Sequence, residues 1–449
     1  MISGTIIPTP LPGQRASGPI GRGGRLLYLT LGLSYIASYY FYEPILLIGL
    51  AGLTTALFRP IRLTDLAFAF LVIDIRAEGI ESAINYSLVS TILFNLLFLK
   101  VLASSRLALG RPIVIALALL SLHWLAAFLI NFNEASLFNA LQDMRIVVVG
   151  VVAVLLVGGP KLLESDLENL NWFFGGVLFA FIVLILVTPG NKFYISMDSI
   201  KALVILPSLY AIMTNRLNAG LVLATITIFV LTYFSSRYLF VTYLGALGIL
   251  IVYKAPAKAA VGVAVTVFVA AAVGQDSLEF NRMLTMLDFF RTPDENYYGP
   301  FFSRVASIDR IRAMEGYYVF ADASPPQLLF GRGFGAQIRD TLGFVNYDLA
   351  DGAAFSVREI QTRVFGNLHD PLIEWQLRFG AVFLIGFAVF AGKSVIHGLR
   401  RSNILSYALP FIALNCYWSG KGIFVILVIL VFAAQEWRRI PRMSSSRDV

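Results

Sequence analysis

Long apolar stretches alternate with short polar ones along most of the chain, and one polar stretch is far longer than the others. Apolar cores occur near 26–41, 44–58, 64–75, 84–104, 112–131, 145–159, 171–188, 200–213, 219–234, 238–253, 258–273, 374–391, 403–418 and 422–436. An apolar helix of about 20 residues is long enough to cross a bilayer, and several of these cores are shorter. The pattern therefore predicts an all-α polytopic membrane protein with about 12–14 transmembrane helices.

The apolar cores divide the chain into five successive regions. These are a tail (1–25), eleven transmembrane helices (26–273), a large polar loop (274–368), three further transmembrane helices (369–437) and a basic tail (438–449). The tail at 1–25 is expected to be disordered, because it is rich in prolines and glycines and contains no apolar core. Apolar residues at helical spacing predict helices at 302–323 and 355–365, so the loop should be mainly helical.

The composition excludes a soluble globular protein. Apolar residues make up 58% of the 449 residues and charged residues 14%, whereas soluble domains have about half and about a quarter. When the chain is threaded with its N-terminus in the cytoplasm, 19 of the 35 basic residues but only 6 of the 27 acidic residues fall inside. The net charge of +8 then follows from the positive-inside rule and not from nucleic-acid binding. The polar loop faces outward, which for a bacterial inner membrane means the periplasm.

Residues that bind metals or form disulfides are scarce. Cys416 is the only cysteine, and neither His123 nor His397 lies near His369 in sequence. We therefore expect no metal site, and no phosphate-binding loop for a nucleotide is present. No cofactor is expected.

The polar loop carries nine arginines and no lysine. A guanidinium group offers a rigid fork of donors that suits phosphate oxygens, whereas a lysine is a mobile point charge. The alternative is that most of these arginines pair with the twelve acidic residues of the same loop. Only a few of them are then site residues.

His369 ends the loop and opens the segment His369–Gly380, which enters the next apolar helix. Asp370 followed by Pro371 predicts an N-cap and a first-turn proline, so His369 should stand just before a helix N-terminus. The partial positive charge there disfavours the imidazolium form, and a neutral histidine can accept a proton. The alternatives are a structural histidine at an interface and an Asp370 that is a cap and nothing more.

Two further patterns place arginines on the outer side. Ser235-Ser236-Arg237 opens an apolar helix at its outer end, where an unpaired arginine at membrane depth would cost about 2.5–3.5 kcal/mol. An anionic ligand would offset that cost; the alternative is an arginine that extends to the lipid headgroups. Arg145 is a weaker candidate of the same kind.

The second pattern lies in the loop, where Arg310 and Arg312 precede a predicted helix, a proline pair and the turn Gly331–Gly335.

These patterns resemble the O-antigen ligase and O-antigen polymerase superfamily. The resemblance covers mainly residues 220–395 and is most specific at His369–Gly380, where a histidine, a small polar residue, nine residues and a glycine enter a helix. It implies an inverting, metal-independent glycosyltransferase that uses a saccharide linked by pyrophosphate to undecaprenol. His369 would then take a proton from the acceptor hydroxyl. Arg237 with Arg310 or Arg312 would bind the pyrophosphate, and Arg145, Arg304 and Asp370 are additional candidates.

Three functions remain open at this point. A polymerase would use a lipid-linked repeat unit as acceptor and would work with a chain-length regulator, whereas a ligase would use lipid A–core; the long loop favours the polymerase. A transporter or lipid flippase would also have 12–14 spans, but it should carry charged or broken segments at mid-membrane and repeat symmetry between its halves. Here the charges gather at the outer boundary. The expected partners are the lipid-linked donor, the saccharide acceptor and the bilayer, with no nucleic acid.

Overall fold

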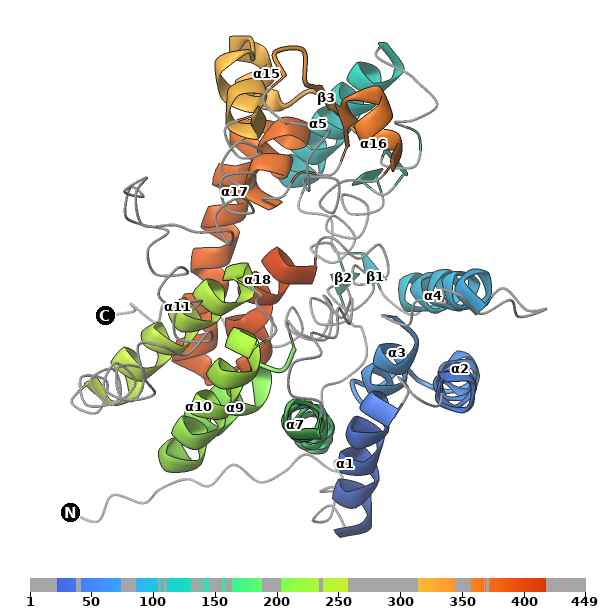
Figure 1. Ribbon diagram of the computed structural model, residues 1–449, viewed down its shortest axis with the longest axis vertical. Helices are drawn as coiled ribbons and strands as arrows, with labels where there is room; N and C mark the ends of the chain where they lie inside the picture. The colour runs from blue at the N-terminus through green and yellow to red at the C-terminus, as the bar shows by residue number, and fades with distance from the viewer. Residues whose placement is uncertain are drawn as a thin grey trace, which may run out of the picture.

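The computed structural model describes a little over half of the chain. The described residues are 22–37, 42–73, 86–103, 106–107, 111–130, 137, 140–141, 143–144, 156–157, 164–187, 203–233, 237–256, 314–343, 357–366, 368 and 371–416. Most of them are helical (Figure 1). The expected helical class therefore holds for the described part of the chain.

Thirteen α-helices and one π-helical turn are described. They are α1 (Arg22–Ala37), α2 (Tyr42–Phe58), α3 (Asp65–Ile73), α4 (Tyr86–Ala103), α5 (Arg111–Ile130), α7 (Glu164–Val187), α9 (Leu206–Met213), α10 (Leu217–Tyr233), α11 (Arg237–Lys254), η2 (Tyr317–Ala321), α15 (Pro325–Phe330), α16 (Val357–Thr362), α17 (Pro371–Arg401) and α18 (Ile404–Cys416). A helix lies over eleven of the fourteen predicted apolar cores. The cores at 258–273 and 422–436 lie outside the described residues.

Two pairs of very short antiparallel strands complete the described structure. β1 (Arg106–Leu107) pairs with β2 (Leu156–Val157), and β3 (Ile338–Arg339) pairs with β4 (Val364–Phe365). The helix predicted over 145–159 is therefore wrong at its end, where Gly158, Gly159 and Pro160 follow and disfavour helix continuation.

The helix predicted at 355–365 is also shorter than expected. It ends at Thr362, because Arg363 adopts a left-handed conformation (φ 54°) and its N–H bonds to the Glu359 carbonyl at 2.8 Å. Strand β4 follows. The helix predicted at 302–323 is observed in its described part, from Met314 to Ala321, with a π-helical turn at its end.

Two of the described helices are long and apolar enough to cross a membrane. These segments are Ser165–Val183 in α7 and Leu372–Arg401 in α17. Five shorter apolar stretches of 10–17 residues lie in α2, α5, α10, α11 and α18. Association with a membrane thus has support from two helices, and a polytopic topology remains a prediction.

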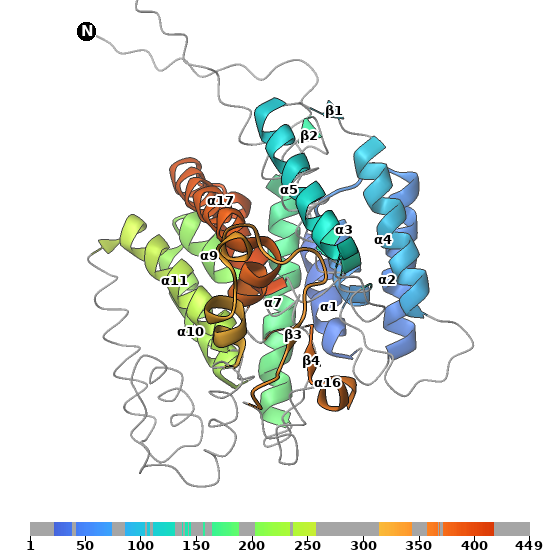
Figure 2. The same cartoon turned by 90° about the horizontal axis from the view of Figure 1, so that it is seen from above.

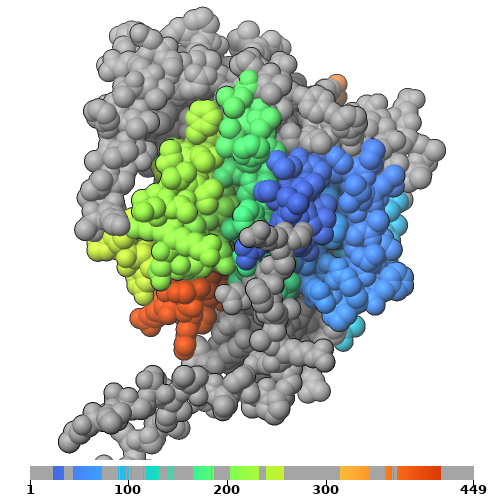
Figure 3. Space-filling view, turned by 90° about the horizontal axis from the view of Figure 1, so that it is seen from below, coloured from blue at the N-terminus to red at the C-terminus, as the bar shows by residue number. Residues whose placement is uncertain are grey.

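One large apolar core is formed by buried residues of eight helices, which are α2, α3, α4, α7, α9, α10, α11 and α18. α1 and the second half of α17 pack against it with partly buried side chains, and we call the eight helices together with α1 the apolar bundle. Figure 3 shows α7 (green) between the N-terminal helices (blue) and α9–α11 (yellow-green). Glycines let α1 approach α7: a Cβ on Gly32 would lie 2.1 Å from the Phe173 carbonyl oxygen. Small residues allow this close approach in helix pairs.

The second region lies at the other end of α17, and we call residues 314–343 and 357–366 the cap. Figure 1 shows α15, β3 and α16 gathered there beside α5 and the first turns of α17, and Figure 2 gives the view from above. Two small apolar clusters form its interior, one around Tyr318, Phe365 and Leu377 and the other around Trp124 and Phe379. The cap therefore packs on α5 and on the beginning of α17.

Candidate functional site

The structure describes the surroundings of the predicted catalytic residue but not the residue itself. His369, Asp370, Arg145, Arg304, Arg310 and Arg312 lie outside the described residues. Arg237 is the first residue of α11, as its Ser-Arg pattern predicted, but its side chain is not described. α17 begins at Pro371, which confirms the helix start that the Asp370–Pro371 pair predicted. The roles assigned to these seven residues stay predictions.

α17 is broken at Gly380, the last residue of the histidine motif. Gly380 has φ 75° and ψ 176°, a conformation that is essentially restricted to glycine. The cap turn Gly331–Gly335 crosses the helix at this break. Arg332 N donates to the Leu377 carbonyl at 2.7 Å, and Gly333 N donates to the Arg378 carbonyl at 3.1 Å. Two motifs that are separate in sequence are thus joined by backbone hydrogen bonds.

The crossing leaves no room for side chains at its centre. Gly331 has φ 79° and ψ 177°, nearly the same conformation as Gly380. A Cβ on Gly331 would lie 2.2 Å from the Arg378 carbonyl oxygen, and a Cβ on Gly380 would lie 2.4 Å from Gly331 N. Both positions therefore need glycine for conformation and for space.

α5 holds the opposite side of the turn. Phe334 N donates to the Trp124 carbonyl at 3.3 Å, and Trp124 Nε1 donates to the Phe330 carbonyl at 2.7 Å. The Trp124 side chain is fully buried and contacts the rings of Phe334 and Phe379, with centroids 5.8 Å and 5.0 Å away. The turn is fixed between α5 and α17.

Three charged side chains are buried where α17 meets the cap. Arg378 Nη1 lies 2.5 Å from Asp143 Oδ1, and Arg378 Nη2 lies 2.6 Å from Glu374 Oε1. Asp143 Oδ2 accepts a hydrogen bond from Gly335 N at 2.7 Å, and Arg378 Nη2 also donates to the Gly366 carbonyl at 2.5 Å. All three side chains are at most 2% exposed. Arg378 thus connects α17 with both halves of the cap and with the segment that follows α5.

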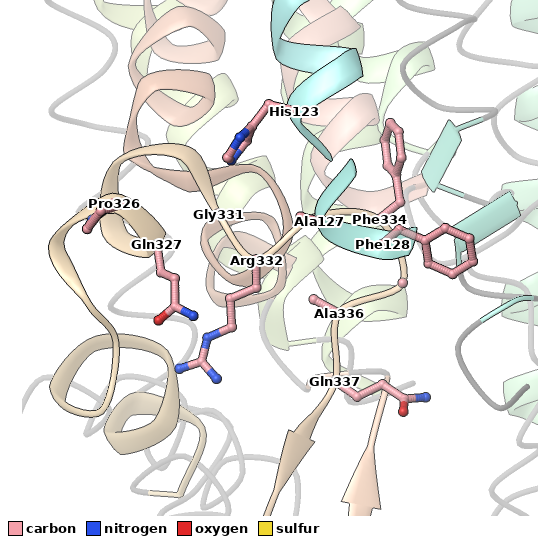
Figure 4. A pocket seen from close by; sticks show the side chains of 11 residues that line it. His123, Ala127, Phe128, Pro326, Gln327, Gly331, Arg332, Phe334, Ala336 and Gln337 are labelled. Atoms are coloured by element: carbon pink, nitrogen blue, oxygen red, sulfur yellow. The ribbon is translucent and has the colours of Figure 1, made fainter. Parts of the chain in front are cut away.

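A half-open pocket of about 350 Å³ lies beside the turn, between α5 and α15. It is lined by His123, Ala127 and Phe128 of α5, by Pro326 and Gln327 of α15, and by Gly331, Arg332, Phe334, Gly335, Ala336 and Gln337 of the cap. The lining contains one guanidinium, one imidazole and two carboxamides but no carboxylate. In Figure 4, Arg332 and Gln327 extend to the same side, and the His123 ring lies across the pocket from them.

The Arg332 side chain contacts two other residues of the cap. Its Nη2 donates to the Tyr318 carbonyl, and the same nitrogen lies 3.9 Å from Asp322 Oδ2, whose side chain is 53% exposed. Burial lowers the pKa of Arg332, and the charge of Asp322 offsets part of that shift. An arginine stays protonated over the ordinary pH range, so the pocket contains a cation.

Sequence reasoning did not predict this pocket. His123 lies within the apolar core predicted at 112–131, where the sequence indicates no role for it, and Arg332 is one of nine loop arginines. The spacing of His123, Ala127 and Phe128 puts them on one helix face, but the partner surface is about 200 residues away in sequence. The turn that contains Arg332 follows helix α15 and not a strand, which argues against a dinucleotide site.

No protein-family model matches the chain, and no curated protein matches it significantly. In the part of the chain that the structure describes, no group of three or more His, Cys, Asp or Glu side chains is placed to hold a metal ion.

Proposed function

We propose that the protein is a polytopic glycosyltransferase of the bacterial inner membrane. It uses saccharides linked by pyrophosphate to undecaprenol and works at the periplasmic face, as a polymerase of O-antigen or exopolysaccharide. The observation that carries the proposal is the crossing of Gly331 and Gly380. Gly331 belongs to the loop pattern that ends at Gly335, and Gly380 belongs to the histidine motif. Their contact brings these two parts of the resemblance together in the first turns of α17.

The proposed reaction follows from a neutral histidine at the start of α17. His369 takes the proton from an acceptor hydroxyl while the hydroxyl oxygen attacks the anomeric carbon. The bond between that carbon and the pyrophosphate oxygen breaks, and the configuration inverts. General base catalysis of this kind contributes about 10²–10⁴-fold to the rate.

Arginines stabilise the leaving group in this mechanism. Arg237 and either Arg310 or Arg312 bind the pyrophosphate, whose negative charge grows as the bond breaks. Arg145 and Arg304 are further candidates for this contact, and the role proposed for Asp370 is that of a helix cap. The bidentate fork of arginine suits phosphate oxygens better than lysine does, so Arg237→Lys should remain impaired.

A ligase that transfers the chain to lipid A–core is the second candidate. It needs the same donor site and the same base, and it differs only in its acceptor. Transport is the third candidate, but the buried charges of Glu374 and Arg378 lie in the first turns of α17, where the cap packs, and not at its middle.

The test is glycan analysis of a deletion strain that carries wild type, His369→Ala or the control His397→Ala. His397 lies in the last turns of the same helix, away from the cap. Accumulation of single repeat units with His369→Ala indicates a polymerase, and accumulation of long lipid-linked chains indicates a ligase. Unchanged glycans with His369→Ala would overturn the proposal and return the question to transport.

A further inference from the structure

The pocket between α5 and α15 has the size and chemistry of a binding site. Its volume of about 350 Å³ falls in the range of about 300–1,000 Å³ that is usual for small-molecule sites. Arg332 and Gln327 on one side and His123 across from them provide donors and acceptors, as a ligand with many hydroxyl groups requires, and Gln337 also lines the pocket. The pocket is therefore better suited to a polar ligand than to a lipid chain.

The charge of the lining selects for an anion. Arg332 contributes a full positive charge and no lining residue contributes a negative one. The carboxylate that lies near the guanidinium belongs to Asp322, which is 3.9 Å away and half-exposed. At that distance and exposure the ion pair is weak, so a carboxylate or phosphate of a ligand can replace it at little cost.

The backbone around Arg332 is fixed before any ligand arrives. Gly331 and Gly333 lie on either side of it, and both are fixed against neighbouring backbone: a Cβ on Gly333 would lie 2.8 Å from the Trp124 carbonyl oxygen. Arg332 N is itself bonded to α17 through the Leu377 carbonyl. Such preorganisation lowers the entropy that a ligand must overcome on binding.

The pocket lies close to the start of α17 but not at it. Leu377 is six positions beyond Pro371 in α17, which corresponds to about 9 Å of helix rise. A group bound at Arg332 would thus lie beside the reacting centre and not in it. Binding energy from such remote groups orients the reacting group and raises kcat.

From these observations we infer that the pocket formed by α5, α15 and the Gly331–Gly335 turn is a subsite for an acidic sugar residue of the saccharide substrate, with Arg332 binding its carboxylate or phosphate. The inference rests on the proposed function. It adds the class of sugar and a place for it, neither of which follows from the histidine motif.

The test is a ligand-observed NMR titration of the full-length protein in phosphatidylcholine nanodiscs. The probes are digalacturonate and its uncharged counterpart digalactose. Wild type should bind digalacturonate at least about tenfold more tightly than digalactose, since one charge-assisted hydrogen-bond pair contributes about that much. Equal binding of the two sugars, or no binding of either, would overturn the inference.

Three variants assign the effect to the pocket. Arg332→Gln should reduce digalacturonate binding at least about tenfold, while the control Arg339→Gln, an exposed arginine of β3, should leave it unchanged. Because Arg332→Gln also loses a contact to the Tyr318 carbonyl, Gln337→Glu provides a second test. It adds a negative charge to the lining at nearly constant shape, so it should weaken digalacturonate binding and spare digalactose. Full digalacturonate binding in both lining variants would contradict the inference.

Two comparisons separate this inference from its alternatives. Nanodiscs that contain phosphatidylglycerol should leave digalacturonate binding intact; if the anionic lipid abolishes it, a lipid headgroup occupies the pocket and the inference is wrong.

The second comparison uses His369→Ala, which should retain digalacturonate binding while it loses glycan synthesis. Normal glycan synthesis by His369→Ala would overturn the proposed function and leave the pocket result standing. If glycan synthesis depends on His369 but the protein does not bind digalacturonate, the proposed function stands and the subsite is overturned.

Discussion

The apolar bundle and the cap are held together by different kinds of contact. In the bundle, the core is formed by apolar side chains, and a polar contact such as that between Ser208 and Tyr243, whose oxygens lie 2.6 Å apart, supplements it. Where the cap meets α5 and α17, buried ions, backbone hydrogen bonds between distant segments and the crossing of Gly331 and Gly380 hold the structure together.

The difference determines how each region responds to substitution. Apolar packing is made of many small terms, so a change of shape at constant volume is tolerated. A buried charge or a backbone crossing instead depends on one partner, and its loss leaves the other partner without compensation. The cap should therefore fail at single positions where the apolar side chains of the bundle core adapt, and within the bundle only close backbone approaches such as Gly32 on Phe173 should be equally sensitive.

Gly380→Ala should produce the largest loss of stability. The substitution forces a side chain into a conformation that costs about 1–3 kcal/mol, and the collision with Gly331 N adds overpacking of about 1–3 kcal/mol. Thermal unfolding of the detergent-purified protein measures the effect. The matched control is Gly386→Ala in the same helix, where a Cβ meets nothing within 4 Å and a gain of about 0.5–1 kcal/mol is expected. Equal unfolding temperatures for the two variants would refute the crossing.

Arg378→Met should come next, with a loss of about 3–5 kcal/mol, because it leaves the buried carboxylates of Asp143 and Glu374 without their cation. The control is Arg25→Met, which removes a pair to Glu168 at 3.0 Å with an arginine that is 41% exposed. That loss should stay within about 1 kcal/mol. Comparable losses in denaturant unfolding of the two variants would show that the buried cluster has no special role.

Trp124→Phe tests the contact between α5 and the cap turn. It keeps an aromatic ring but removes the donor to the Phe330 carbonyl, and we expect a loss of about 1–3 kcal/mol. Trp172→Phe is the control, since Trp172 is 38% exposed in α7. Protease cleavage within the cap should accelerate for Trp124→Phe only, and an unchanged cleavage rate would argue against the contact.

Leu409→Met should have the smallest effect. Leu409 is 1% exposed in the bundle core, and an apolar replacement of similar volume costs less than about 1.5 kcal/mol. Leu409→Ala shows whether the position is packed, because it should lose about 2–5 kcal/mol in the same unfolding assay. If Leu409→Met is as damaging as Gly380→Ala, the distinction between the two regions fails.

The sequence predicted what depends on local pattern. Apolar periodicity located eleven helices, and the Asp370–Pro371 pair located the start of α17, because both signals lie within the element that they form. The end at Thr362 and the strand at Leu156 were missed, since a left-handed Arg363 and a strand partner override helical spacing.

The candidate site depends on contacts that no local pattern contains. Asp143 and Arg378 are 235 residues apart in sequence, and His123 and Arg332 line one pocket from two distant segments. Glycines at Gly331 and Gly380 were visible as motif positions, but only the fold shows that each is required by the other. The predicted roles of His369 and the outer arginines still rest on sequence alone.

The crossing of Gly331 and Gly380 has a consequence for how such chains diverge. A Cβ added at Gly331 would collide with the backbone of Arg378 and Phe379, and a Cβ added at Gly380 would collide with the backbone of Gly331 and Leu329, so a change of side chain elsewhere cannot compensate for either substitution. Homologous chains that keep the crossing should therefore keep both glycines, even where the helices around them have changed most of their residues. A chain that has lost one should have lost the pair, and its cap should meet the helix equivalent to α17 in another way.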